Sequence, residues 1–190
     1  IAGGGSAGCA AASRLSEDPG CKVLLLEAGP DPRPIPDIVA RAAMQPRLLL
    51  ESPYMMMYPT PRTIDGSVYY NLAGRIMGGG SSVNVMSVIR PLEHDLDTWV
   101  ALGNSNWSYE RMLPVMKRIE SDQDFPESPL HGIEGPLYVK RGWTLDMPAS
   151  EPVRAFIDRA VAMGMPLCPD LNIPNPIGVC ASPYAIKDGM

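Results

Sequence analysis

The chain has 190 residues, of which 45% are hydrophobic and 19% charged, and its formal net charge is −5 at pH 7. This is the ordinary balance of a globular protein with room for one domain or slightly more. The negative charge argues against a surface for nucleic acids or anionic membranes, and no apolar run approaches the roughly 20 residues of a membrane span. No signal peptide is visible. We therefore expect a cytoplasmic protein without a nucleic-acid partner or a membrane span.

The chain opens with the glycine-rich stretch "IAGGGSAG", in which Gly3, Gly5 and Gly8 form the pattern G-x-G-x-x-G. The segment "AAASRLSE" predicts a helix over Ala10–Glu17, which the following "DPG" ends. The apolar run "CKVLLLEAG" then has the length of a buried parallel strand. This order of turn, helix and strand is typical of a dinucleotide-binding domain.

Each residue of the motif has a physical task. Gly3 permits the tight turn, Gly5 lets the backbone approach a pyrophosphate, and Gly8 lets the helix pack closely on the sheet. The helix N-terminus attracts the phosphates. Glu27 follows at about the expected 20 residues and would accept hydrogen bonds from the ribose hydroxyls, which favours FAD or NAD over NADP. The expected cofactor contacts here are Gly3, Gly5, Ser6, Ala7, Gly8, Glu27 and Ala28.

Two other interpretations of the opening stretch exist. Gly4 to Gly8 also fit G-x-S-x-G, the nucleophile elbow of serine hydrolases, and the stretch could be a plain turn. The elbow follows several earlier strands, whereas only Ile1 and Ala2 precede these glycines, and it gives no reason for Glu27. We therefore favour the dinucleotide site and expect that the first strand has lost its start, because strands need about five residues.

A second glycine cluster, "GRIMGGGSSVNVM", runs from Gly74 to Met86. Such a cluster is uncommon in an NAD domain, whereas FAD is longer and needs contacts for its diphosphate or flavin end. Its small residues would let the backbone lie against a flat ring. The alternatives are a glycine-rich surface loop or an NAD-binding module.

Together, the two clusters resemble the glucose–methanol–choline (GMC) family of FAD-dependent oxidoreductases. "GGGSAGCAAASRLSEDPGCKVLLLEAG" resembles the opening of that family, and "GRIMGGGSSVNVMSVIRPLEHDLDTW" resembles its first signature. The likeness continues in "LHGIEGPLYVKR" and covers nearly the whole chain. Met77 and Val88 are mild departures. The signature positions are Gly74, Arg75, Gly78, Gly79, Gly80, Ser81, Val83, Asn84, Pro91 and Asp97.

The resemblance implies where the cofactor lies. Asn84 would lie beside the isoalloxazine, with the backbone of residues 85–87 near its polar edge. Some family members attach FAD covalently through a histidine where this chain has Val83, so the resemblance implies non-covalent FAD. The implied contacts of the second cluster are Arg75, Gly78, Gly79, Ser81, Asn84, Val85, Met86 and Ser87.

The resemblance also implies the activity. A base removes the proton of an alcohol, and hydride passes from its carbon to flavin N5, with reoxidation by oxygen or another acceptor. The family's catalytic histidine lies near its C-terminus, and no segment here matches it, so we expect no catalytic residue and no metal in this chain. The alternative within the family is a hydroxynitrile lyase, which binds FAD without net redox chemistry.

The implied fold class is α/β. We expect a Rossmann-like FAD-binding domain with a parallel sheet over residues 1–140 and the beginning of an interleaved α+β substrate domain over residues 141–190. The expected partners are a small-molecule alcohol and the remainder of the same polypeptide.

Several side chains outside the motifs allow more than one interpretation. Met55–Met57, flanked by Tyr54 and Tyr58, suit buried packing or, alternatively, a pocket wall. His94 is expected to be a solvated surface residue and His131 a turn residue. Cys9, Cys21, Cys168 and Cys180 form no C-x-x-C pair and suit isolated thiols in a reducing cytosol.

The pattern predicts five more elements. They are a short helix broken at Pro46, a helix capped by Ser105 or Ser108, a strand over Gly135–Arg141, a helix over Ser150–Gly164 and a strand within Gly178–Met190.

Overall fold

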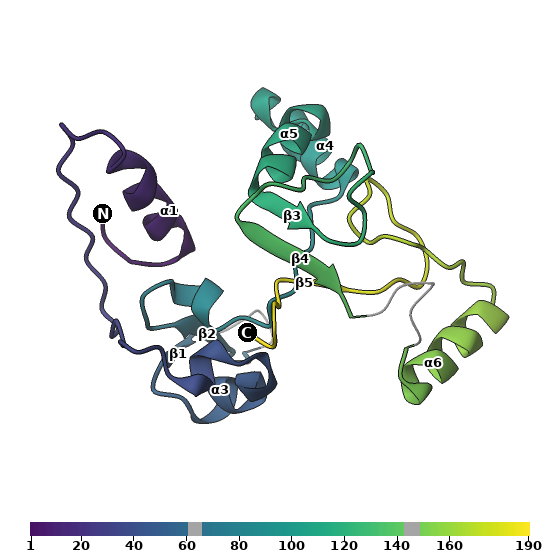
Figure 1. The fold of residues 1–190 in the computed structure, drawn as a ribbon, viewed down its shortest axis with the longest axis horizontal. Helices are drawn as coiled ribbons and strands as arrows, with labels where there is room; N and C mark the ends of the chain where they lie inside the picture. Colours follow the sequence, from purple (N-terminus) through teal and green to yellow (C-terminus); the bar gives the residue numbers. More distant parts are fainter. Residues whose placement is uncertain (61–65, 143–148) are drawn as a thin grey trace. The chain divides into compact units, whose positions relative to one another are not determined.

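A computed structural model describes residues 1–60, 66–142 and 149–190. The chain forms two compact units, which are considered separately below (Figure 1). Unit 1 contains Ile1–Met86 and Asp188–Met190, and unit 2 contains Ser87–Lys187. The division at Met86 precedes the domain change that the sequence suggests near residue 140, and the extent of the FAD-binding domain stays a prediction.

Unit 1 begins with the predicted turn, helix and parallel segment. Gly3 N donates to Leu26 O at 2.7 Å and Leu26 N donates to Ile1 O at 2.9 Å, so residues 1–3 run parallel to the segment around Leu26. Between them lies helix α1 (Ser6–Leu15). The predicted start at Ala10 is wrong, because Gly5 takes the extended N-cap conformation and the small residues after it are already helical.

The predicted strand over 21–29 is reduced to one isolated parallel bridge at Leu26. The side chains of Leu24 and Leu26 are 69% and 59% exposed. Buried parallel strands are apolar because both of their faces are covered, whereas the described residues leave most of the surface of these two leucines exposed. The pairing direction agrees with an α/β fold, whereas the interleaved substrate domain stays a prediction.

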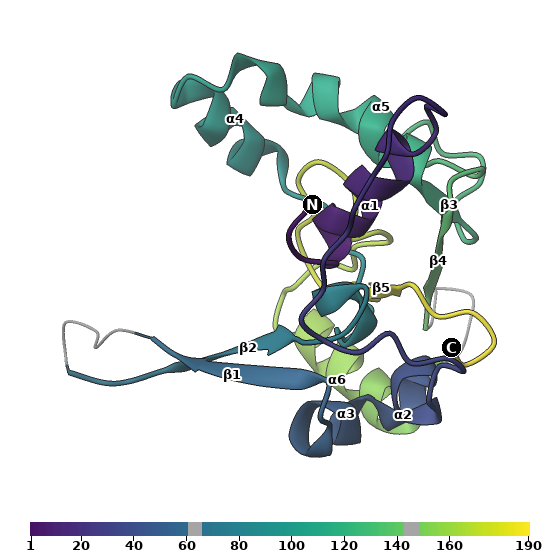
Figure 2. The ribbon, with the colours of Figure 1, turned by 90° about the vertical axis from the view of Figure 1, so that its left-hand side faces the viewer.

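The rest of unit 1 surrounds a small apolar core. Leu48, Ile76 and Val83 are buried there, and Tyr54 and Met55 pack against them. The elements are α2 (Asp37–Ala40), η1 (Ala42–Met44), α3 (Gln45–Glu51), the antiparallel strands β1 (Met55–Pro59) and β2 (Tyr70–Gly74), and η2 (Gly79–Ser82). Figure 2 shows β1 and β2 as a long two-stranded ribbon.

Two expectations about unit 1 need correction. Pro46 does not break a helix but lies in the first turn of α3, where its missing N–H group is not needed. Met57 and Tyr58 are 64% and 46% exposed, so buried packing is wrong for them although it holds for Tyr54 and Met55.

Unit 2 contains seven helices and strands in its described residues: α4 (Glu93–Ala101), η3 (Ser105–Trp107), α5 (Tyr109–Ile119), β3 (Glu120–Asp122), β4 (Leu137–Arg141), α6 (Glu151–Ala162) and β5 (Pro183–Tyr184). The three strands form a sheet in the order β3-β4-β5, with β3 parallel and β5 antiparallel to β4 (Figure 1). Leu96, Tyr109 and Met116 form the buried core between helices α4 and α5.

The local signals of unit 2 are mostly confirmed. Strand β4 lies where the alternation predicts it, Ser108 precedes α5, and α6 begins after Ser150. The strand predicted within 178–190 is reduced to Pro183–Tyr184. Among the described residues, no helix is both long and apolar enough to cross a membrane.

Candidate functional site

The two glycine-rich loops lie against each other in unit 1. Gly78 N donates to Gly4 O at 2.7 Å. A Cβ atom on Gly79 would lie only 2.7 Å from the Cα of Gly5, and Gly79 has a φ of +55°. The contact therefore leaves no room for a side chain at Gly79. Two clusters that the sequence predicts as separate cofactor contacts thus form one surface.

The N-terminus of α1 offers free hydrogen-bond donors at this surface. Gly5 is the N-cap, no side chain caps the helix, and its first turn has no acidic residue. In the described part of the chain, the N–H groups of Ser6, Ala7 and Gly8 have no acceptor. A Cβ atom on Gly8 would lie 1.9 Å from Gly3 O, so the helix starts closely behind the turn. Unpaired N–H groups at a helix start are suited to an anion.

Glu27 links the turn to the end of the second segment. Its Oε2 accepts a hydrogen bond from Gly4 N at 2.7 Å, and its Oε1 accepts one from Gly29 N at 2.8 Å. A carboxylate oxygen has two acceptor positions, so each oxygen retains one for a ribose hydroxyl. Ala28 and Arg75 are exposed. A Cβ atom on Gly29 would lie 2.2 Å from Arg75 O, which places Arg75 beside the Glu27 turn.

Three residues of this site were missed in the sequence. Gly4 is buried, and its two backbone groups join Glu27 and Gly78. The Sγ of Cys9 donates to Gly4 O at 3.1 Å and lies 3.8 Å from the Sδ of Met77. Cys9 is therefore not the isolated thiol that the sequence suggests. Its position directly after Gly8 is the sequence signal that places it behind the turn.

The serine-hydrolase interpretation gains nothing from unit 1. Ser6 is exposed at the start of α1. Both histidines of the chain, His94 and His131, belong to unit 2, so unit 1 supplies no histidine base for Ser6.

The segment predicted to face the flavin is an exposed turn. Asn84 and Val85 are exposed, while Val83 is buried in the core of unit 1. Met86 N donates to Asn84 Oδ1 at 2.9 Å, and Met86 has a φ of +58°. Ser87 begins unit 2. At the start of η2, the hydroxyl of Ser81 donates to Gly78 O at 2.7 Å.

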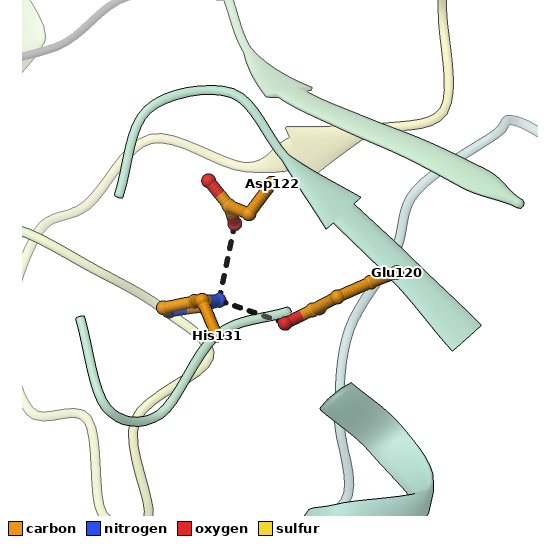
Figure 3. A group of neighbouring side chains, drawn as sticks. All are labelled: Glu120, Asp122 and His131. Carbon is orange, nitrogen blue, oxygen red and sulfur yellow. Dashed lines mark hydrogen bonds and ion pairs between the residues drawn. The ribbon is translucent and has the colours of Figure 1, made fainter. Parts of the chain in front are cut away.

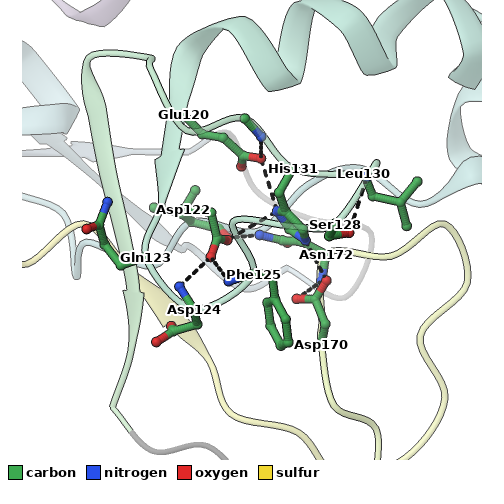
Figure 4. A network of polar contacts seen from close by, with 12 residues as sticks. Glu120, Asp122, Gln123, Asp124, Phe125, Ser128, Leu130, His131, Asp170 and Asn172 are labelled. Carbon is green, nitrogen blue, oxygen red and sulfur yellow. Dashed lines mark hydrogen bonds and ion pairs between the residues drawn. The ribbon is translucent and has the colours of Figure 1, made fainter.

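Unit 2 contains a buried ionic network that the sequence does not predict (Figure 4). His131, expected as a turn residue, is at its centre with a side chain that is 1% exposed. His94 is a surface residue, as expected, with a side chain that is 70% exposed. The other buried charged residues of the network are Arg90, Glu120, Asp122, Arg141 and Asp170.

Both ring nitrogens of His131 contact carboxylates. Nδ1 lies 3.0 Å from Glu120 Oε1 and 3.1 Å from Asp122 Oδ2, as Figure 3 shows, and Nε2 lies 2.8 Å from Asp170 Oδ2. Burial lowers the pKa of His131, but its hydrogen bonds to the three carboxylates outweigh burial and raise the pKa to about 10. His131 is thus a buried imidazolium with two donated hydrogen bonds at neutral pH.

Two arginines, Arg90 and Arg141, neutralise the remaining negative charge of the three carboxylates. Arg141 Nη1 donates to both oxygens of Asp122 at 2.9 Å, and its Nη2 donates to Asp170 at 2.7 Å. Arg90 pairs with Glu120 and donates to Leu130 O. Burial raises the pKa of Asp122, but the hydrogen bonds from His131 and Arg141 outweigh it and hold that pKa well below its usual range.

The ligand atoms of Glu120, Asp122 and His131 are close enough together to hold a metal ion (Figure 3). Here, however, His131 donates through the nitrogen that a metal would need, and an arginine already pairs with each carboxylate. A divalent cation would have to displace a proton and oppose two guanidinium groups. We therefore assign the cluster as an ion-pair network.

Comparison with known proteins identifies the family. A family model for the GMC oxidoreductases matches residues 1–189. The chain belongs to the GMC oxidoreductase family. The resemblance seen in the two glycine clusters is therefore confirmed, and GMC oxidoreductases are FAD-dependent enzymes.

Similar GMC proteins include oxidases and dehydrogenases. The chain is 37% identical to choline oxidase of Arthrobacter globiformis over 170 residues, which are 87% of this chain and 30% of that protein. It is 36% identical to pyridoxine 4-oxidase of Microbacterium luteolum over 193 residues, covering 100% of this chain and 36% of that protein. The crystal structure of pyridoxine 4-oxidase from "Mesorbium loti" superposes with a TM-score of 0.83 at 36% identity, over 99% of this chain and 36% of that one. The chain thus spans about a third of the length of these GMC relatives.

Proposed function

We propose that this chain forms the FAD-binding part of a GMC enzyme that oxidises an alcohol. The observation that carries the proposal is the contact of the two glycine loops at the uncapped start of α1. It brings the unpaired N–H groups at the start of α1, the carboxylate of Glu27 and the signature loop together in one unit. Family membership supports the same assignment.

The residues of unit 1 fit the parts of FAD. The N–H groups of Ser6, Ala7 and Gly8 would bind the diphosphate, with the partial positive charge of the helix terminus favouring its negative charge. Glu27 would accept hydrogen bonds from the adenosine ribose. The turn of residues 84–87 would lie at the isoalloxazine. When bound, FAD supplies the hydride acceptor, and these residues hold and orient it.

The FAD is proposed to be non-covalent. Val83 is an aliphatic side chain buried with Leu48 and Ile76 in the core of unit 1. It has no group that forms a bond to a flavin, and it faces apolar neighbours.

A cytoplasmic location is proposed as well, because the four cysteines are free thiols, which fits a reducing compartment.

An alcohol is proposed as the substrate because the names of several GMC relatives specify oxidation of an alcohol. Choline oxidase and the alcohol dehydrogenase of Pseudomonas putida, which is 36% identical over 140 residues, are examples. This chain covers 25% of the length of the alcohol dehydrogenase. Alcohol oxidation is therefore proposed for the whole polypeptide and not for this chain alone.

Anaerobic titration of the full-length protein with primary alcohols tests this function. We expect at least one alcohol to bleach the visible absorbance band of the flavin, with reappearance of the band when an electron acceptor is added. A panel of cyanohydrins serves as the comparison. Cleavage of a cyanohydrin without any bleaching by alcohols would contradict alcohol oxidation and favour a lyase.

A further inference from the structure

The segment that follows the flavin turn is held by an unusual partner in unit 2. Residues 87–90 run beside β5, where Ser87 forms an antiparallel bridge with Tyr184 and Val88 N donates to Pro183 O at 2.9 Å. The side-chain amide of Asn172 provides two further hydrogen bonds. Its Nδ2 donates to Val88 O at 2.9 Å, and its Oδ1 accepts from Arg90 N at 3.0 Å.

Asn172 thus acts on this segment as a strand would. One amide offers both a donor and an acceptor, which is the pair of groups that a neighbouring backbone presents in a sheet. The side chain is buried, with the whole residue only 1% exposed, so water does not compete for these bonds. We name Asn172, with its bonds to Val88 and Arg90, the amide clamp.

The ionic network fixes the clamp in turn. Asn172 N donates to Asp170 Oδ1 at 3.0 Å, and the same carboxylate group contacts Arg141 and His131. Arg90, the other end of the clamped segment, pairs with Glu120. Buried charged groups therefore hold both partners of the clamp, Asn172 through Asp170 and Arg90 through Glu120.

The turn before the clamp has a conformation that needs support. Met86 is in the left-handed region, with a φ of +58°. This conformation is unfavourable for a non-glycine residue and persists where the surrounding structure imposes it. Val83, buried in unit 1, anchors the chain before Met86, and the amide clamp anchors it two residues later, at Val88.

We propose that Asn172 is a positioning residue for the flavin, acting through the backbone of residues 84–87. The inference rests on the proposed function, because it assumes that these residues lie at the isoalloxazine. Loss of the clamp would leave Val88 O and Arg90 N without their partners, so that, within the described residues, only the contacts with β5 and the Arg90 side chain would hold the segment after the turn. A misplacement of reacting groups on the order of 1 Å can lower a reaction rate about a hundredfold, so a relaxed turn would hold the flavin less productively.

The test uses the full-length protein with Asn172→Leu, a change that keeps the number and branching of side-chain heavy atoms and removes both hydrogen bonds. Asn175→Leu is the matched control, because Asn175 is three positions along, donates to Glu93 and has no bond to residues 87–90. We expect N172L to raise the Kd for FAD about tenfold, which corresponds to about 1.4 kcal/mol of lost binding free energy, and to change the visible circular dichroism of the bound flavin. N175L is expected to leave both unchanged.

The outcomes separate the two proposals. If FAD-saturated N172L melts at a lower temperature but has the flavin spectrum and Kd of N175L, Asn172 is merely structural and the inference is wrong. If neither N175L nor the unsubstituted protein binds FAD, the proposed function fails, and the inference fails with it. Should N172L not fold, Asn172→Asp decides the question. It keeps the acceptor for Arg90 N but not the donor to Val88, and an unchanged flavin spectrum in that variant overturns the inference.

Discussion

Replacing Gly79 with alanine in the full-length protein is expected to abolish retention of FAD during purification. The added Cβ would lie 2.7 Å from the Cα of Gly5, whereas carbon atoms pack at about 3.5–4.0 Å. The two loops would have to separate by about 1 Å, and alanine at a positive φ adds roughly 1–2 kcal/mol of backbone strain. We expect less than about a tenth of the normal FAD content, which requires a loss of more than about 1.4 kcal/mol of binding free energy.

Gly142→Ala is the matched control for this substitution. Gly142 is exposed, and apart from its chain neighbours no atom of the described residues lies within 4 Å of the position of its Cβ. FAD content is measured by absorbance after purification, and far-ultraviolet circular dichroism verifies that both variants are folded. Full FAD occupancy in folded G79A would contradict the role of the loop contact.

The second large effect concerns His131 and alkaline pH. The folded state holds the imidazolium proton up to a pKa of about 10, whereas the unfolded state releases it near 6.5. Since the folded state binds more protons in this interval, stability falls as pH rises from about 6.5 to 10, by up to about 1.4 kcal/mol per pH unit from this group. Below this interval the contribution is fully present.

His131→Gln is expected to remove this pH dependence and to lower stability at pH 7. Glutamine carries no charge, so Glu120, Asp122 and Asp170 would lose their shared imidazolium partner, and removing one partner of buried charges costs about 3–5 kcal/mol. The measurement is the midpoint of thermal unfolding of the full-length protein between pH 6.5 and 10. His94→Gln is the control, because His94 is on the surface. Parallel pH profiles for H131Q and H94Q would rule out the proposed protonation state.

The same network also makes the folded state less stable at acid pH, through Asp122. The pKa of Asp122 is held below its ordinary value in the folded state, so its contribution is present above about pH 4 and is lost as the pH falls further. Together, His131 and Asp122 favour the folded state most between about pH 4 and 6.5.

The features that could be predicted from the sequence depend on neighbouring residues. The glycine pattern, the helix after it, strand β4 and helix α6 each have a signal within a dozen positions. Family membership follows from two such local motifs. The prediction that Pro46 breaks a helix is wrong, because proline can either end a helix or begin one. The surrounding chain determines which of the two occurs.

The features that were missed depend on residues that are distant in the sequence. His131 contacts Glu120 and Asp170, from which it is 11 and 39 positions away, and no spacing rule connects them. Gly79 contacts Gly5, which lies far from it in the sequence, so the sequence shows the two glycine clusters but not their contact. The exposed Leu24 and Leu26 show a further limit, because an apolar run indicates burial but not what covers it.

Absorbance of the purified full-length protein before and after acid precipitation tests the central claim most directly. That claim is that unit 1 holds FAD without a covalent bond. We predict flavin bands in the intact protein and their release into the supernatant on precipitation. Bands that remain with the pellet would contradict non-covalent binding, and a protein that shows no flavin even after incubation with FAD would contradict the assignment of the two glycine loops as its cofactor site.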